Sequence, residues 1–202
     1  PEIPVVFEGV NDEEYAMKAA ENPLVTGIIE KLSVEKNIDM ALKVNPTADK
    51  VVAILDDSVT ADAERKNFYN SAENYPELEF SEINAAELET ARLQQAISKV
   101  DDKTILIYIV MSKDGSGKQY TSDQAVRMVV NYSKVPVYRM VEAGIGDGLL
   151  GGNVVSMYKS GEIAAQMAMD IANGTDSAEI NVVKDSPNIY CVDEDVMRKF
   201  GL

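Results

Sequence analysis

The sequence predicts an α/β protein with a doubly wound, mainly parallel sheet. Apolar runs of strand length alternate with segments of helical period through the middle of the chain, which is typical of βαβ units. Residues 51–55 and 104–111 form the two most apolar runs, as expected of strands that are covered on both faces of a sheet. Both runs end in polar residues, at Asp56 and at Ser112.

The first elements are defined by turn and cap residues. A strand is expected at residues 5–10, leading into the turn residues Asn11 and Asp12, and a second strand at 25–29. Ser33 is in position to cap a helix whose apolar residues recur every four positions, and Asn45-Pro46 ends it.

The later helices and strands follow from periodicity. Thr121 and Gln124 form a capping box ahead of one apolar stripe, and a further stripe runs from Leu93 to Val100. Near the end of the chain we expect a strand at 153–157, a helix at 160–173 closed by Gly174 in the left-handed position, and a strand at 189–192.

Composition excludes several classes of protein. The 34 acidic and 19 basic residues give a net charge of −15, which opposes binding to nucleic acid or anionic membranes. Histidine is absent and Cys191 is the only cysteine, so an intrachain disulfide, a structural cysteine–metal site and the usual Ser-His and Cys-His nucleophile pairs are excluded. We therefore expect no catalysis, no cofactor and no metal. The sequence has no apolar run of about 20 residues and no signal-peptide pattern, so any export signal would lie outside it.

Two glycine motifs do not fit the sites that they resemble. The GSGK string at 115–118 lacks the earlier glycine and the following hydroxyl residue of a phosphate-binding loop. Gly146, Gly148 and Gly151 match a dinucleotide fingerprint, but a strand-like segment follows them where a helix should begin. We expect these glycines to serve tight backbone turns instead.

Carboxylates recur at the ends of the predicted strands. In open α/β sheets, ligands bind in the crevice outside the carboxyl ends of the strands, although aspartates there are also common turn formers and caps. Asp114 is the leading candidate because it follows the most apolar strand and precedes a polar, glycine-containing loop. The full set is Asp56, Asp57, Asp114, Glu142 and Asp147.

The chain resembles the ABC-type substrate-binding domain family, in particular the versions that serve as extracytoplasmic sensors of bacterial histidine kinases and diguanylate cyclases. The specific segments are PVVFEGVND at 4–12 and the stretch from SKVPVYRM to DIANG at 133–174, with weaker similarity at 25–58 and 186–202. The resemblance implies a type I periplasmic-binding-protein fold, in which two α/β lobes hold a ligand between them.

In that layout the start of the first lobe is expected to be missing from this sequence. Residues 1–22 and 150–176 would be the remnant of the first lobe, and residues 23–149 and 177–202 the second lobe. The helix at 160–173 would then lack part of the sheet that normally covers it. Leaving its apolar side chains in water is unfavourable, so we expect this chain to self-associate.

The resemblance also implies which residues line the cleft. Asn11 and Asp12 match the crossing between lobes, Asp57 and Ser58 a strand-end turn, and Glu142 the acidic position after PVYRM. Asp114 matches a strand-end aspartate that could pair with the amine of a ligand. The expected ligand is an amino acid or another small metabolite.

Two binding functions stay open. One is a membrane-anchored extracytoplasmic sensor domain of a signalling protein. The alternative is the solute receptor of an ABC importer, whose partner would be a membrane permease. The gene sequence beyond Leu202 would distinguish them. An enzyme or a sugar-responsive repressor on a similar fold ranks well below both.

Overall fold

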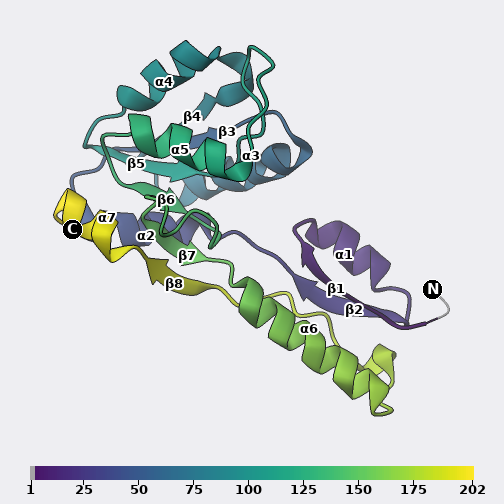
Figure 1. Cartoon of the computed structure of the whole chain (residues 1–202). Coiled ribbons are helices and arrows are strands. Elements are labelled where there is room, and N and C mark those ends of the chain that lie inside the picture. The colour runs from purple at the N-terminus through teal and green to yellow at the C-terminus, as the bar shows by residue number, and fades with distance from the viewer. Residues whose placement is uncertain (1–2) are drawn as a thin grey trace. The chain divides into compact units, whose positions relative to one another are not determined.

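The computed structural model describes residues 3–202, and the chain divides into two compact units (Figure 1). Unit 1 comprises the chain up to Leu32 together with Val155–Ile189. Unit 2 comprises Ser33–Val154 and Tyr190–Leu202. Each unit is built from segments that lie far apart in the sequence, so neither is a simple continuous domain.

A six-stranded sheet forms the centre of unit 2, with the strand order β4-β3-β5-β6-β7-β8. The pairs β3/β4, β3/β5, β5/β6 and β6/β7 are all parallel, which confirms the predicted α/β class with a mainly parallel sheet. The strands are β3 (Lys50–Leu55), β4 (Glu79–Asn84), β5 (Thr104–Tyr108), β6 (Val137–Arg139), β7 (Gly151–Val154) and β8 (Ile189–Val192).

Both faces of this sheet are covered. On one face, Ile54, Leu106 and Tyr108 belong to a core that also contains residues of helices α4 (Thr90–Ser98) and α5 (Ser122–Tyr132). Successive side chains of a strand point to opposite faces, so Ala53 and Ile107 lie on the other face, where both are fully buried. The continuous apolar runs of β3 and β5 are explained by this double covering.

The predicted N-cap positions of two helices are confirmed. Ser33 is the N-cap of α2 (Val34–Val44), and Thr121 and Gln124 form the reciprocal capping box of α5. Several elements of unit 2 were not predicted. Among them are α3 (Val59–Ser71), β4 and α7 (Glu194–Phe200), each of which has a weak or mixed apolar pattern.

A parallel pair of strands, β1 (Val5–Val10) and β2 (Val25–Ile29), lies in unit 1 and is connected by the short helix α1 (Glu13–Ala19). Val183 extends this pair on the β2 side, donating to the carbonyl of Gly27 and accepting from the amide of Ile29, both at 2.9 Å. Helix α6 (Met157–Ala172) packs against β1 and β2, and a short 3-10 helix, η3 (Ser177–Glu179), follows it.

Helix α6 begins earlier than expected. The sequence predicted a start at residue 160, whereas Ser156 is the N-cap and accepts from the amide of Lys159 at 3.4 Å. Met167 is buried against the unit, but Met169 keeps 59 % of its surface exposed. The helix therefore buries one stripe on β1 and β2 and leaves a second apolar side chain in solvent.

The boundaries of the two units differ from the expected lobe boundaries. Residues 25–29 were expected in the second lobe, but β2 pairs with β1 in unit 1, so the chain passes into unit 2 only after Leu32. On the return, β7 pairs with β6 and belongs to unit 2, whereas residues 177–189 remain in unit 1 because Val183 pairs with β2. Backbone pairing, which the local sequence does not reveal, sets these boundaries.

Strand β7 is held by unusually close neighbours. The Asn37 side chain of α2 donates to the carbonyl of Asn153 at 2.8 Å and accepts from its amide at 3.1 Å, as a neighbouring strand would. A Cβ atom at Gly152 would lie 1.8 Å from Oδ1 of Asn37, and one at Gly151 would lie 2.2 Å from the carbonyl oxygen of Cys191. Glycine is required at both positions so that the backbone can approach this closely.

Candidate functional site

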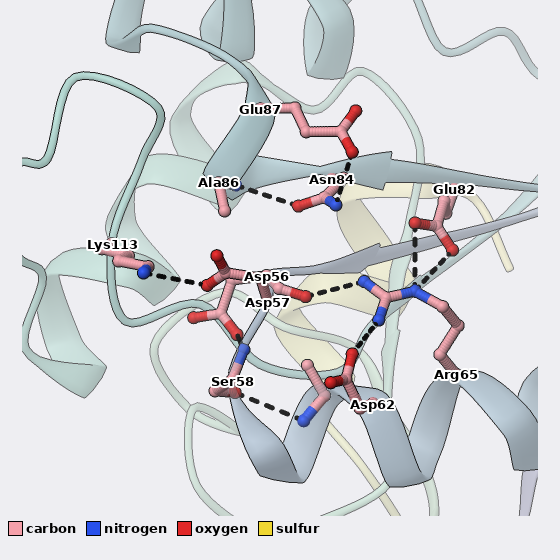
Figure 2. A network of polar contacts seen from close by, with 11 residues as sticks. Asp56, Asp57, Ser58, Asp62, Arg65, Glu82, Asn84, Ala86, Glu87 and Lys113 are labelled. Atoms are coloured by element: carbon pink, nitrogen blue, oxygen red, sulfur yellow. Dashed lines mark hydrogen bonds and ion pairs between the residues drawn. The ribbon is translucent and has the colours of Figure 1, made fainter.

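The carboxyl ends of β3, β4, β5 and β6 meet at one edge of the unit 2 sheet. Leu55 lies beside Asn84, and Tyr108 lies beside both Ile54 and Arg139. The loops after these strands supply the polar side chains that Figure 2 shows in part. We call this edge, with the loops that follow the four strands, the carboxyl edge.

Asp56 is a buried carboxylate that joins two of these loops. It accepts from the amide and hydroxyl of Ser112 at 2.7 and 2.5 Å and from the amide of Ser58 at 3.0 Å. Burial alone would raise the pKa of Asp56, but these hydrogen bonds stabilise the charged form and hold the pKa below its ordinary value. Asp56 therefore fixes the loop after β5 to the turn after β3.

Asp57 and Ser58 differ in how free they are to meet a ligand. The Asp57 side chain is 53 % exposed and forms an ion pair of 3.1 Å with Lys113 (Figure 2). Ser58 is the N-cap of α3 and its hydroxyl accepts from the amide of Ala61 at 3.3 Å. The Asp57 carboxylate is thus accessible at the carboxyl edge, whereas the Ser58 hydroxyl is already engaged in capping α3.

Arg65 anchors α3 beneath this turn. Its Nε donates to both carboxylate oxygens of Glu82 at 3.1 and 3.0 Å, and Nη1 donates to Asp62 at 2.5 Å (Figure 2). Nη2 donates to the main-chain carbonyl of Asp56 at 2.7 Å. The positive charge of Arg65 is therefore balanced by two carboxylates.

Several polar residues of the carboxyl edge were not among the residues predicted from the sequence. Asn84 ends β4, accepts from the amide of Ala86 at 3.0 Å and donates to Glu87 at 3.2 Å (Figure 2). Lys113 is the partner of Asp57. A correct prediction of β4 would have placed Asn84 and Glu87 at a strand end, but the mixed pattern of EFSEIN does not distinguish a strand from a loop.

Asp114 is buried, with 2 % of its surface exposed. Its Oδ2 accepts from the hydroxyls of Thr90 and Tyr120 at 2.5 and 2.8 Å. Its Oδ1 accepts from the amide and hydroxyl of Ser116 at 3.0 and 2.6 Å and from the amide of Lys118 at 3.1 Å. Burial alone would raise the pKa of Asp114, but these hydrogen bonds hold it far below the ordinary range. A carboxylate offers about four lone-pair sites, so five donors leave no acceptor for a ligand amine.

Glu142 follows β6 in a turn that begins directly after the strand. It is partly buried, and its carboxylate has no hydrogen bond or ion pair within residues 3–202. Of the candidate residues beside β3, β5 and β6, Asp57 and Glu142 therefore have free acceptor capacity. Asp56 and Asp114 instead organise the loops around them.

The two remaining candidates lie in unit 1. Asp12 is the N-cap of α1 and accepts from the amide of Tyr15 at 2.8 Å. Asn11 donates to Glu30 at 3.4 Å, and burial raises the pKa of Glu30. Both candidates are exposed at the end of β1, where the sequence predicted a turn.

The described part of the chain contains neither a cluster of metal-ligating side chains nor a helix fit to span a membrane. Within residues 3–202, no group of three or more histidine, cysteine, aspartate or glutamate side chains is arranged to hold a metal ion. Over the same residues, no helix has both the length and the apolar character needed to cross a bilayer.

Comparisons with known proteins agree on one family. The model of the family described as ABC transporter substrate binding protein matches residues 1–202. A tyrosine-binding protein of Clostridioides difficile is 23 % identical over 206 residues, which cover all of this chain and 58 % of that protein. The chain thus spans less than two thirds of the length of this relative.

Solved structures share the fold at low sequence identity. A conserved domain protein from Vibrio cholerae has a TM-score of 0.68 at 15 % identity, covering 98 % of this chain and 67 % of that one. A ligand-free, open substrate-binding protein with adhesive properties from Clostridium difficile has a TM-score of 0.68 at 19 % identity, with coverages of 89 % and 59 %.

A third solved structure was determined with a ligand. It is an ABC domain from Streptococcus pneumoniae in complex with L-Trp, with a TM-score of 0.63 at 16 % identity and coverages of 88 % and 60 %. These likenesses establish a substrate-binding-protein fold, and the family model covers the whole length of this sequence. The chain therefore belongs to the ABC transporter substrate-binding protein family.

Proposed function

We propose that this protein binds an amino acid at the carboxyl edge of unit 2, without chemistry. The observation that carries the proposal is the pair of accessible carboxylates there. Asp57 is half exposed and Glu142 has no partner within residues 3–202, and both lie beyond the ends of parallel strands, where α/β sheets bind ligands. A relative that binds tyrosine and a neighbour solved with L-Trp support an amino acid as the ligand.

Either accessible carboxylate has the chemistry to bind an α-ammonium group. A charge-assisted hydrogen bond of this kind contributes roughly 1.5 to 3 kcal/mol. Asp57 is at present paired with Lys113, and both side chains are about half exposed, so this pair is weak and a ligand ammonium can replace the lysine. Asn11 and Asp12 of unit 1 remain proposed ligand residues as well.

The test is calorimetric titration of the purified protein with the twenty L-amino acids, followed by two matched variants. Asp57→Asn should weaken binding of the preferred amino acid by about tenfold or more. Asp101→Asn is the control, because Asp101 also pairs with a lysine, Lys50, at 3.0 Å, but precedes β5 at the opposite edge of the sheet. Equal affinities of the two variants would refute the assignment of Asp57.

The proposed cellular role is that of an extracytoplasmic sensor domain, membrane-anchored in the full-length protein and coupled to a signalling partner. In such a sensor the ligand shifts the population of a signalling state, and a shift from 1:99 to 99:1 needs a preference of about 5.5 kcal/mol. A sequence that continues past Leu202 into a membrane span and a kinase or cyclase domain would support this role.

The receptor of an ABC importer is the second candidate, and the family description favours it. In that role the partner is a membrane permease rather than a signalling domain. Uptake of the preferred radiolabelled amino acid by cells, abolished by deletion of the gene and restored by the wild-type gene, would support the importer and oppose the sensor.

A further inference from the structure

Arg139 is a buried cation that no carboxylate within residues 3–202 neutralises. Only 9 % of its surface is exposed, and burial lowers the pKa of its guanidinium, although arginine stays protonated in proteins. Its acceptors within residues 3–202 are three main-chain carbonyls: Tyr108 at 3.0 Å, Ala143 at 3.2 Å, and Ile109. Arg65 shows the usual arrangement, in which two carboxylates balance the charge.

The guanidinium lies at the carboxyl edge. Arg139 is the last residue of β6, and it lies beside Tyr108, the last residue of β5, with its guanidinium carbon 4.5 Å from the centre of the tyrosine ring. The carbonyls that it binds belong to the ends of β5 and to the turn after β6. These contacts fix the plane and direction of the guanidinium before any ligand arrives.

One nitrogen of this guanidinium is still available. Nε and Nη1 donate to the carbonyls, whereas Nη2 has no hydrogen bond within the described chain and is not among its enclosed, unpartnered polar atoms. Nη2 is therefore unpartnered and not fully enclosed by the described residues. Partial charges of carbonyls compensate a buried cation only in part, and an anion would compensate it fully.

We propose that Arg139 binds the α-carboxylate of the amino acid through Nη2, which makes it the residue that selects amino acids over amines. The inference rests on the proposed function, because it concerns the same edge and the same ligand class. Arginine suits this role because its planar donors match a carboxylate and its charge strengthens the hydrogen bond. Asp57 and Glu142 then supply the negative charge that the ligand ammonium requires.

The test compares each amino acid with its decarboxylated analogue, using L-tyrosine against tyramine and L-tryptophan against tryptamine. The wild-type protein should prefer the amino acid by about 10- to 100-fold, the range of a charge-assisted hydrogen bond. Arg139→Met should bring this ratio close to one, because the variant keeps an unbranched side chain and removes the guanidinium and its charge. Arg139→Lys should restore part of the preference.

Arg65→Met is the matched control. It removes a cation of the same unit that its own carboxylates already balance, so it should leave the ratio of amino acid to amine unchanged even if the protein becomes less stable. Because the readout is a ratio measured on each folded variant, a loss of stability at Arg139 does not by itself alter it.

The outcomes separate this inference from the proposed function. Wild-type protein that binds tyrosine and tyramine equally well, or Arg139→Met that keeps the wild-type ratio, would overturn the role of Arg139 and leave amino-acid binding intact. Wild-type protein that binds none of the four compounds and no other L-amino acid would overturn both proposals. A ratio that collapses in Arg139→Met and persists in Arg65→Met supports the inference.

Discussion

Replacing Asp114 should destabilise unit 2 rather than remove a direct ligand contact. The variant Asp114→Ala removes the acceptor for five donors, of which the Tyr120 hydroxyl is the most deeply buried. The donors of Ser116 and Lys118 are exposed and can turn to water. Those of Tyr120 and Thr90 cannot do so freely, and each loses roughly 1.5 kcal/mol or more. We expect a fall of about 3 kcal/mol in the free energy of unfolding.

The pH dependence gives a second signature of Asp114. Its folded-state pKa is depressed, so its contribution to stability is fully present above the ordinary aspartate pKa of about 4 and is lost as the pH falls towards the folded value. In that window the unfolded chain takes up a proton that the folded carboxylate does not. The difference between wild type and Asp114→Asn should therefore shrink by up to about 1.4 kcal/mol per pH unit below pH 4.

Urea unfolding followed by circular dichroism, at pH 7 and at steps down to pH 3, measures both effects. Asp57→Ala is the control, because Asp57 is 53 % exposed and has a single ion pair, so its loss should change the unfolding free energy by less than about 1 kcal/mol. If Asp114→Ala costs no more than Asp57→Ala at pH 7, or if the gap between wild type and Asp114→Asn widens in acid, the structural role assigned to Asp114 is wrong.

Three further predictions concern packing, charge and assembly. Asn37→Leu should lower the unfolding free energy by roughly 3 kcal/mol in urea titration, because it leaves the buried amide and carbonyl of Asn153 without partners; a loss below 1 kcal/mol would contradict this. Ser112→Ala should raise the pKa of Asp56 towards its ordinary value, since one hydrogen bond to the carboxylate disappears. Carboxyl NMR titration measures this pKa, and an unchanged value in the variant would contradict the prediction. The predicted self-association should depend on the exposed face of α6. Met169→Glu should therefore shift the sedimentation of the protein at micromolar concentration towards the monomer. A wild-type protein that is already monomeric would contradict this prediction.

Local sequence determined the elements whose signals lie within a few residues of one another. The apolar runs of β3 and β5 record burial on both faces of a sheet, and the capping box of α5 satisfies helix amides through its own Thr121 and Gln124. Such contacts depend on residues that are close in the chain, so they can be predicted without knowledge of the fold. The turn glycines follow the same logic, and Gly146 and Gly148 indeed have positive φ angles.

Elements stabilised by distant partners were missed. The buried face of α3 includes Glu64 and Ala61, so it has no strong apolar stripe, and Arg65 anchors it to Glu82 of β4, a strand with a mixed pattern of its own. The assignment of β2 to unit 1 likewise depends on its pairing with β1. These arrangements are decided by groups that meet only when the chain has folded.

The residues of the candidate site also separate into features that the local sequence predicts and features that only the tertiary structure decides. Sequence alone placed Asp57, Asp114 and Glu142 at strand ends, because the carboxyl ends of parallel strands share one edge of a sheet. It could not tell which carboxylate is accessible, since the donors that enclose Asp114 come from Thr90 and from Tyr120, which lie 24 and 6 residues away. Nor could it reveal that Arg139 is buried without a counter-ion among the residues that the structure describes. Sequence therefore determined where the polar groups gather, and tertiary structure decided which of them are still free to bind, because hydrogen-bond capacity is used up by partners that only folding brings within reach.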